Sequence, residues 1–140
     1  MASIHQDIRA ALESHLNNTA NLPSIAYENV AFTPTTGTSF LRSQYVPTST
    51  KPAVRGLNPQ LRYQGIYSVI VFAPEGKGTN EAEGYINTII NSFAATTDIS
   101  FTNGDGDVFK VSIDYAERQQ GLIDSPWYFT PINIGWYIYN

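Results

Sequence analysis

The segment spanning residues 66–72 restricts the possible folds of this chain more than any other segment. Its residues are apolar or aromatic at both alternating sets of positions, with one serine as the exception. The two sets are Ile66, Ile70 and Phe72 on one side and Tyr67, Val69 and Val71 on the other. Because successive side chains of a β-strand point to opposite faces, this pattern predicts an interior strand that is covered on both sides.

Two predicted hairpins lie on either side of this interior strand in the sequence. Residues 25–32 and 39–46 are strand-like, and the Thr, Pro and Gly between them predict a connecting turn. Residues 99–101 and 109–115 form the second pair, because Asn-Gly-Asp-Gly at residues 103–106 supplies the positive φ values of a hairpin turn.

The last predicted strand covers residues 127–139 and carries six aromatic residues. Pro131 lies inside it and has no backbone N–H to donate to a neighbouring strand. The proline therefore predicts a bulge or an edge position.

Two amphipathic helices complete the predicted elements. A Ser-x-x-Gln capping box at residues 3–6 precedes an apolar stripe over residues 4–17. An Asn-x-x-Glu box at residues 80–83 begins a second stripe, which predicts a helix over residues 80–94. The expected order is α-β-β-β-α-β-β-β. Since the strands are not each followed by a helix, we expect an α+β fold, with two helices packed on one face of a mostly antiparallel, mixed sheet.

Length and composition favour one globular domain over residues 1–140. Charged residues make up only 14% and aromatic residues 13%, which disfavours a disordered chain or a coiled coil. The absence of cysteine suits a reducing cytoplasm. We expect no membrane insertion and no signal peptide, because the apolar stretches are short and the first residues lack the pattern of a leader.

Charge is distributed unevenly along the chain. The net charge is −4, yet the segment between Glu28 and Glu75 has no acidic residue and carries +4, while the rest carries −8. The four cations of this segment are Arg42, Lys51, Arg55 and Arg62. Three prolines and a glycine predict an extended basic loop over residues 47–62, without regular structure. Two interpretations of this loop stay open, a docking arm for a partner and a solvated surface loop.

No combination of residues in the sequence matches a catalytic, metal or cofactor site. His5 and His15 lack the i, i+4 spacing of two metal ligands on a helix. Residues 103–107 begin like a calcium loop, but the later glycine and glutamate of that motif are missing. The Gly-Lys-Gly-Thr string at residues 76–79 lacks the spacing of a phosphate-binding loop. We therefore predict that the protein is not an enzyme and has no cofactor or metal.

The aromatic residues of the last strand indicate an interface. Half of them face the core by alternation, and the other half exceed what a lone subunit is expected to expose. Tyrosine and tryptophan are enriched in protein interfaces, although a carbohydrate-binding platform would use the same side chains. Together with the cations, the candidate interface residues are Arg42, Lys51, Arg55, Arg62, Trp127, Trp136, Tyr137 and Tyr139.

Several strings along nearly the whole chain resemble the tail terminator-like proteins of long-tailed bacteriophages. The strings are residues 27–38 and 40–42 near the start, 58–63 and 65–78 in the middle, and 127–128 and 131–136 near the end. The last six residues depart from the family, because they are more aromatic and lack the expected basic end.

The resemblance implies a structural virion protein without catalytic activity. It implies a ring, usually of six subunits, at the head-proximal end of the tail. This ring ends polymerisation of the tail tube, contacts neck or head-completion proteins and lets double-stranded DNA pass through its lumen. The resemblance also implies assembly in the host cytoplasm. Another neck or tube-adjacent connector of the same fold is one alternative, and a carbohydrate-binding module is the alternative from another class.

Overall fold

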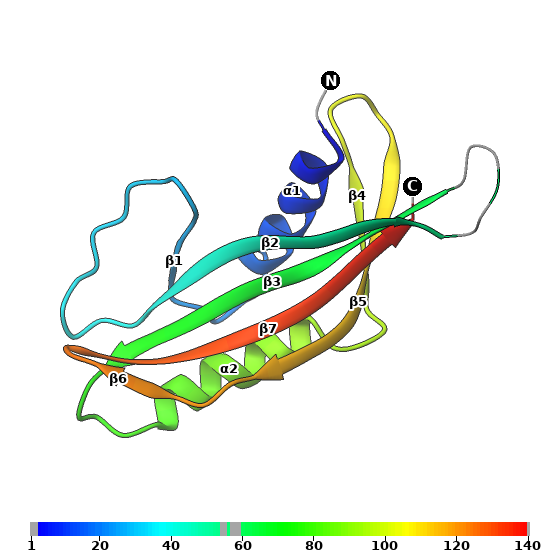
Figure 1. Ribbon diagram of the computed structural model, residues 1–140. Coiled ribbons are helices and arrows are strands. Elements are labelled where there is room, and N and C mark those ends of the chain that lie inside the picture. Colours follow the sequence, from blue (N-terminus) through cyan, green and yellow to red (C-terminus); the bar gives the residue numbers. More distant parts are fainter. Residues whose placement is uncertain (1–2, 54–55, 57–59, 140) are drawn as a thin grey trace.

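The structure is a computed structural model that describes residues 3–53, 56 and 60–139. It has the predicted order of elements, with one additional short strand before the last one (Figure 1). The elements are α1 (Ile4–Asn17), β1 (Ser24–Ala26), β2 (Phe40–Pro52), β3 (Leu61–Pro74), α2 (Asn80–Ser92), β4 (Asp98–Thr102), β5 (Val108–Arg118), β6 (Leu122–Asp124) and β7 (Trp127–Tyr139). The predicted α+β fold is confirmed.

The strands form one mixed sheet in the order β1-β2-β3-β7-β5-β4, and β6 pairs with β7. Every pairing is antiparallel except that of β1 with β2, which is parallel. β3 lies between β2 and β7 over residues 62–72, as expected for an interior strand. The last strand in the chain therefore occupies the middle of the sheet.

Both helices pack on the same face of the sheet and form the main hydrophobic core with it (Figure 1). Ile8 and Leu12 of α1 and Ile86 and Ile89 of α2 are almost completely buried there. The apolar stripes predicted from the sequence therefore face the sheet, as the helical period requires.

The two helices begin differently. The capping box predicted for α1 is present, because the Ser3 hydroxyl accepts from the Gln6 N–H and the Gln6 side chain accepts from the Ser3 N–H. The capping box predicted for α2 is wrong. Its N-cap is Thr79, which has helical dihedral angles and makes no side-chain capping bond, and Asn80 is already the first helical residue. A capping side chain needs the extended backbone that Thr79 lacks.

The face of the sheet opposite the helices, called the helix-free face below, carries a smaller apolar cluster at one end. Phe40 and Phe72 stack with ring centroids 4.5 Å apart, and Trp127 packs edge-on against Phe40 at 5.1 Å. Phe32, from the loop after β1, lies 5.2 Å from Phe40. At this end β3 is therefore covered on both faces, as its apolar pattern predicts.

The hairpin predicted between residues 25–32 and 39–46 is wrong. β1 is only three residues long, and it pairs in parallel with the first three residues of β2. After β1 the chain turns out of the sheet, with Asn29 in the left-handed region at a φ of 57°. The long loop that follows brings the chain back to the end where β1 began. Parallel neighbours require such a crossing connection, whereas a tight turn would have joined antiparallel ones.

The prediction that the basic loop over residues 47–62 lacks regular structure is wrong at both of its ends. β2 continues to Pro52, β3 begins at Leu61, and the two strands pair up to these residues, with a bulge after Pro47. Among the described residues, β1 pairs only with the start of β2, so the rest of β2 is an outer edge. Prolines are tolerated on an edge strand, because their missing N–H groups can face away from the sheet.

Pro131 causes neither a bulge nor an edge position in β7. It lies opposite Ile70 in regular register with β3. On the other side of β7, β5 ends at Arg118 and β6 begins at Leu122, so Pro131 faces the gap between them. Its carbonyl accepts a hydrogen bond from Gln119 in this gap. Since N and C=O of a strand residue point to the same side, the missing N–H also faces the gap, where no strand needs a donor.

Candidate subunit interface

Four predicted interface residues gather at one end of the helix-free face. Lys51 lies directly opposite Arg62, and Arg62 lies directly opposite Tyr139. Directly opposed residues project to the same face of a sheet, and so does Tyr137, which lies two positions before Tyr139. Lys51, Arg62, Tyr137 and Tyr139 are called the basic patch below.

The basic patch is an ordered surface. The guanidinium carbon of Arg62 lies 4.8 Å from the ring centroid of Tyr137 and 5.9 Å from that of Tyr139. A nitrogen of the same guanidinium donates to the side-chain oxygen of Gln64. Cation–π contacts at exposed sites contribute about 0.5–1 kcal/mol each, and they hold the arginine against the sheet without neutralising it. Lys51 is exposed and Tyr139 is 49% exposed, so the patch is open to a partner.

The basic patch also has unused capacity for a partner with negative charge. Lys51 and Arg62 are like charges directly opposite each other, which is unfavourable in a sheet. In the described part of the chain, Nε of Arg62 and Oγ of Ser49 are buried without a hydrogen-bond partner. A pocket of about 300 Å³ opens beside Arg62, and its lining also includes Thr48, Gln64, Asp114 and Tyr115.

Arg42 and Trp127 lie at the other end of the helix-free face. Twelve positions separate Trp127 from Tyr139 on β7, which corresponds to about 40 Å. The guanidinium carbon of Arg42 lies 5.1 Å from the ring centroid of Phe72. A pocket of about 270 Å³ opens here, lined in part by Pro34, Phe40, Arg42, Phe72, Trp127 and Phe129. The predicted residues thus form two separate surfaces.

One of the predicted residues that the structure describes, Trp136, belongs to neither surface. Trp136 is 1% exposed and lies in the core on the helix side, where its ring stacks on Tyr45 with centroids 5.3 Å apart. Every second residue from Ile132 to Ile138 is buried in that core. This alternation was present in the sequence and would have separated Trp136 from its exposed neighbours. Arg55 lies outside the described residues.

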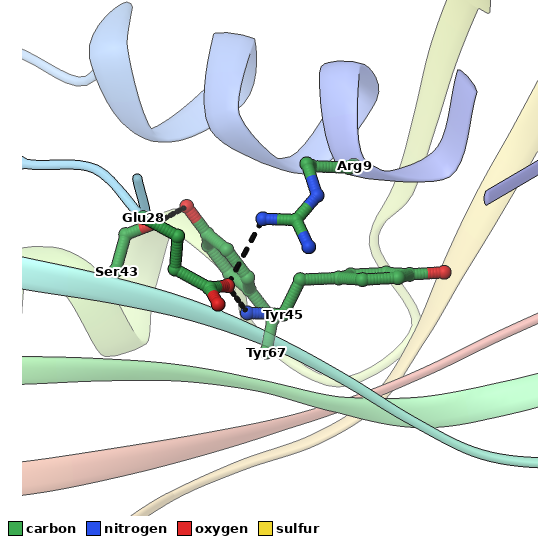
Figure 2. Close-up of polar contacts among 5 residues, drawn as sticks. All are labelled: Arg9, Glu28, Ser43, Tyr45 and Tyr67. Carbon is green, nitrogen blue, oxygen red and sulfur yellow. Dashed lines mark hydrogen bonds and ion pairs between the residues drawn. The ribbon is translucent and has the colours of Figure 1, made fainter. Parts of the chain in front are cut away.

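Sequence reasoning missed a polar cluster between α1 and the outer edge of β2, shown in Figure 2. One carboxylate oxygen of Glu28 accepts from Arg9 at 2.9 Å and from the backbone N–H of Tyr45 at 2.5 Å. The hydroxyl of Tyr67 donates to Ser43 at 2.8 Å. Burial raises the pKa of Tyr45 and of Tyr67 well above the usual range, so both hydroxyls stay neutral. The two hydrogen bonds of Glu28 therefore connect α1 to the edge of the sheet.

Replacing Glu28 with alanine is expected to lower the free energy of unfolding by about 1–2 kcal/mol, measured by urea denaturation. Both Arg9 and the N–H of Tyr45 lose their acceptor in this variant. Hydrogen bonds to charged groups contribute about 1.5–3 kcal/mol, and the partial exposure of Arg9 and Glu28 to solvent reduces this contribution. Glu13 is the matched control, because burial and the carboxylate of Glu28 raise its pKa. Glu13→Gln should not reduce stability, and equal losses in both variants would contradict the assigned role of Glu28.

The histidines make structural contacts. His5 Nδ1 lies 2.7 Å from the hydroxyl of Tyr45, and His15 Nε2 lies 2.8 Å from the carbonyl of Ser92. Across residues 3–53, 56 and 60–139, no group of three or more His, Cys, Asp or Glu side chains could hold a metal ion. None of the helices described there has the length and apolar character to cross a membrane.

Comparisons with known proteins show the family and the fold of the chain. A family model described as phage tail terminator protein matches residues 7–136. One solved structure superposes with a TM-score of 0.71 over 99% of this chain and 97% of that chain, at 24% sequence identity, which shows the shared fold. No curated protein matches the sequence. Because the family model covers nearly the whole chain, this protein belongs to the phage tail terminator family and is a structural protein of a bacteriophage tail.

Proposed function

We propose that six copies of this protein form a ring at the head-proximal end of a phage tail. The ring ends polymerisation of the tail tube and joins the tail to neck or head-completion proteins. The observation that carries this proposal is the match of the tail terminator model to residues 7–136. The two surfaces at opposite ends of the helix-free face support it, because a ring subunit must contact its neighbours and the components above and below the ring.

The size and charge of the subunit fit passage of DNA through such a ring. A globule of 140 residues has a radius of about 19 Å, and six touching spheres of this size enclose a hole about 37 Å wide. The net charge of −4 disfavours binding to phosphate, since affinity for DNA comes from lysine and arginine contacts. DNA would slide through such a lumen with little adhesion.

The proposal is tested by measuring the mass of the assembled protein. Mass photometry and sedimentation of the purified protein, alone and with the tube protein of the same phage, should reveal a closed oligomer of six subunits. Electron microscopy of tubes assembled with the protein should show shorter tubes that carry a ring at one end. A protein that stays monomeric at every concentration, and that leaves tube length unchanged, would contradict the proposal.

The two alternatives make different predictions. A connector at another position of the neck would form a ring without limiting tube length, and its location in the particle would separate it from a terminator. A carbohydrate-binding module has less support, because Trp136 lies in the core and Trp127 packs against Phe40. Glycan binding that is lost in Trp127→Ala while assembly persists would favour that module.

A further inference from the structure

We propose that the acidic turn between β4 and β5 of one subunit docks against the basic patch of the next copy in the ring. This inference rests on the proposed ring and names the two surfaces that close it. The turn consists of residues 103–107 and carries Asp105 and Asp107. The occupant of the basic patch is thus a second copy of this chain.

The topology places the two surfaces where neighbouring subunits of a ring would meet. Tyr139 at the end of β7 lies opposite Arg62, next to the last paired residues of β2 and β3, Pro52 and Leu61. β5 is antiparallel to β7 and its first residues extend past Tyr137, so the β4–β5 turn lies at the same end of the sheet (Figure 1). The β2–β3 hairpin is near one edge of the sheet, while β4 forms the opposite edge. Rotation about a ring axis brings opposite edges of adjacent subunits together at the same level.

The turn presents its negative charge outward. The side-chain oxygen of Asn103 accepts from the N–H groups of Asp105 and Asp107 at 3.0 and 2.9 Å, which fixes the backbone of the turn. Both aspartates are exposed, and neither carboxylate has a hydrogen bond or ion pair within the described residues. With Asp98 and Lys110, the hairpin of β4 and β5 up to Ser112 carries three acidic side chains and one basic one.

Neither Lys51 nor Arg62 forms an ion pair among the described residues, although Asp114 lines the pocket beside Arg62. A carboxylate placed between Lys51 and Arg62 would offset their mutual repulsion, and its oxygens could accept from the exposed ammonium group of Lys51. Truncating one partner of such a pair weakens a complex mainly because the other charge is left without a counterpart. Tyr137 and Tyr139 add aromatic surface of the type enriched in interfaces.

The pairing also explains how contacts can close into a ring. The two surfaces are different, so the β4–β5 turn of each subunit contacts one neighbour and its basic patch contacts the other neighbour. This is a heterologous, head-to-tail contact, which forms a ring when the rotation between subunits closes. A self-complementary patch would instead form a dimer with two-fold symmetry.

Charge reversal tests the inference. Lys51→Glu and the pair Asp105→Lys, Asp107→Lys change exposed side chains, so the isolated subunits should stay folded, as circular dichroism would verify. Each variant should raise the protein concentration needed for half-maximal ring formation at least about tenfold, because like charges would then face each other. Combining all three changes in one chain should restore assembly. Lys77→Glu changes an exposed residue in the turn after β3, at the other end of the sheet, so it is the control and should assemble normally.

Salt provides a second measurement that needs no variant. Assembly of the natural protein should weaken as sodium chloride rises from low to high concentration, and this dependence should be smaller in Lys51→Gln. If the charge-reversed variants form rings at the same concentration as the natural protein, the inference is overturned and the proposed ring stands. The same holds if these variants form rings and lose only binding to the tube protein. A natural protein that never assembles would overturn the ring itself, so the two failures are distinguishable.

Discussion

Trp136→Ala is expected to lower the free energy of unfolding of the isolated subunit by about 3–5 kcal/mol. The indole is 1% exposed, stacks on Tyr45 and packs in the core between the sheet and the helices. Alanine would leave a cavity that the surrounding β-strands cannot close by moving. Urea denaturation at a protein concentration too low for assembly gives the measurement.

Two control variants define what this loss means. Trp136→Phe should cost less than about 1.5 kcal/mol, because it keeps an aromatic ring and removes an indole N–H that is buried without a partner among the described residues. Tyr139→Ala removes an exposed aromatic side chain of the basic patch, so it should affect assembly more than subunit stability. A Trp136→Ala subunit of normal stability that fails only in assembly would show that Trp136 is an interface residue after all.

Gly65→Ala should also destabilise the subunit strongly, by about 3 kcal/mol or more. A Cβ atom at this position would lie 2.5 Å from the carbonyl oxygen of Val46, 2.8 Å from the Cα of Pro47 and 2.7 Å from the indole of Trp136. Two of these three neighbours are backbone atoms of β2, so a side-chain rotation cannot relieve the clash. β2 and β3 would have to separate next to the bulge, at the base of the hairpin that carries the basic patch.

Gly84→Ala is the matched control for this prediction. Gly84 lies in α2, and a Cβ there would meet nothing within 4 Å. Alanine is favoured over glycine inside a helix by about 0.8–1.0 kcal/mol, so this variant should be more stable than the natural protein. Thermal unfolding of the two variants should therefore shift in opposite directions, and a stable Gly65→Ala subunit would contradict the close packing of β2 on β3.

Local patterns predicted the elements whose residues alternate or repeat regularly. The apolar run at residues 66–72 and the aromatic segment at residues 127–139 both became central strands. β3 is longer than its apolar run, because polar residues such as Gln64 continue it on the helix-free face. The pattern of side chains alone cannot show where such a strand ends, because the end of a strand depends on its hydrogen-bonded pairing with the neighbouring strands.

The wrong predictions concern features that depend on distant parts of the chain. Pro47 and Pro52 suggested a loop, but a proline disrupts a strand only where a neighbour needs its N–H, and the outer side of β2 has no such neighbour among the described residues. The direction of β1 was likewise set by the path of the loop that follows it. Neither the missing neighbour of β2 nor the direction of β1 can be predicted from a short stretch of the sequence.

The candidate interface residues remain a prediction. The structure brings Arg62, Tyr137 and Tyr139 close together as exposed or half-exposed residues, a proximity that the sequence did not predict. The role of Glu28 could not be predicted, because its partners Arg9 and Tyr45 are 19 and 17 positions away in the sequence. Long-range polar pairs of this kind follow from the fold and leave no local pattern.

The central position of β7 has a consequence for synthesis of the protein. β3 cannot gain its second neighbour, and the helices cannot cover a complete sheet, until the ribosome has released the residues of β7. A nascent chain that stops before this strand lacks half of the pairing of β3 and the tyrosines beside Arg62. Only subunits translated through β7 would therefore be competent to join a growing particle, which would keep truncated chains out of the virion.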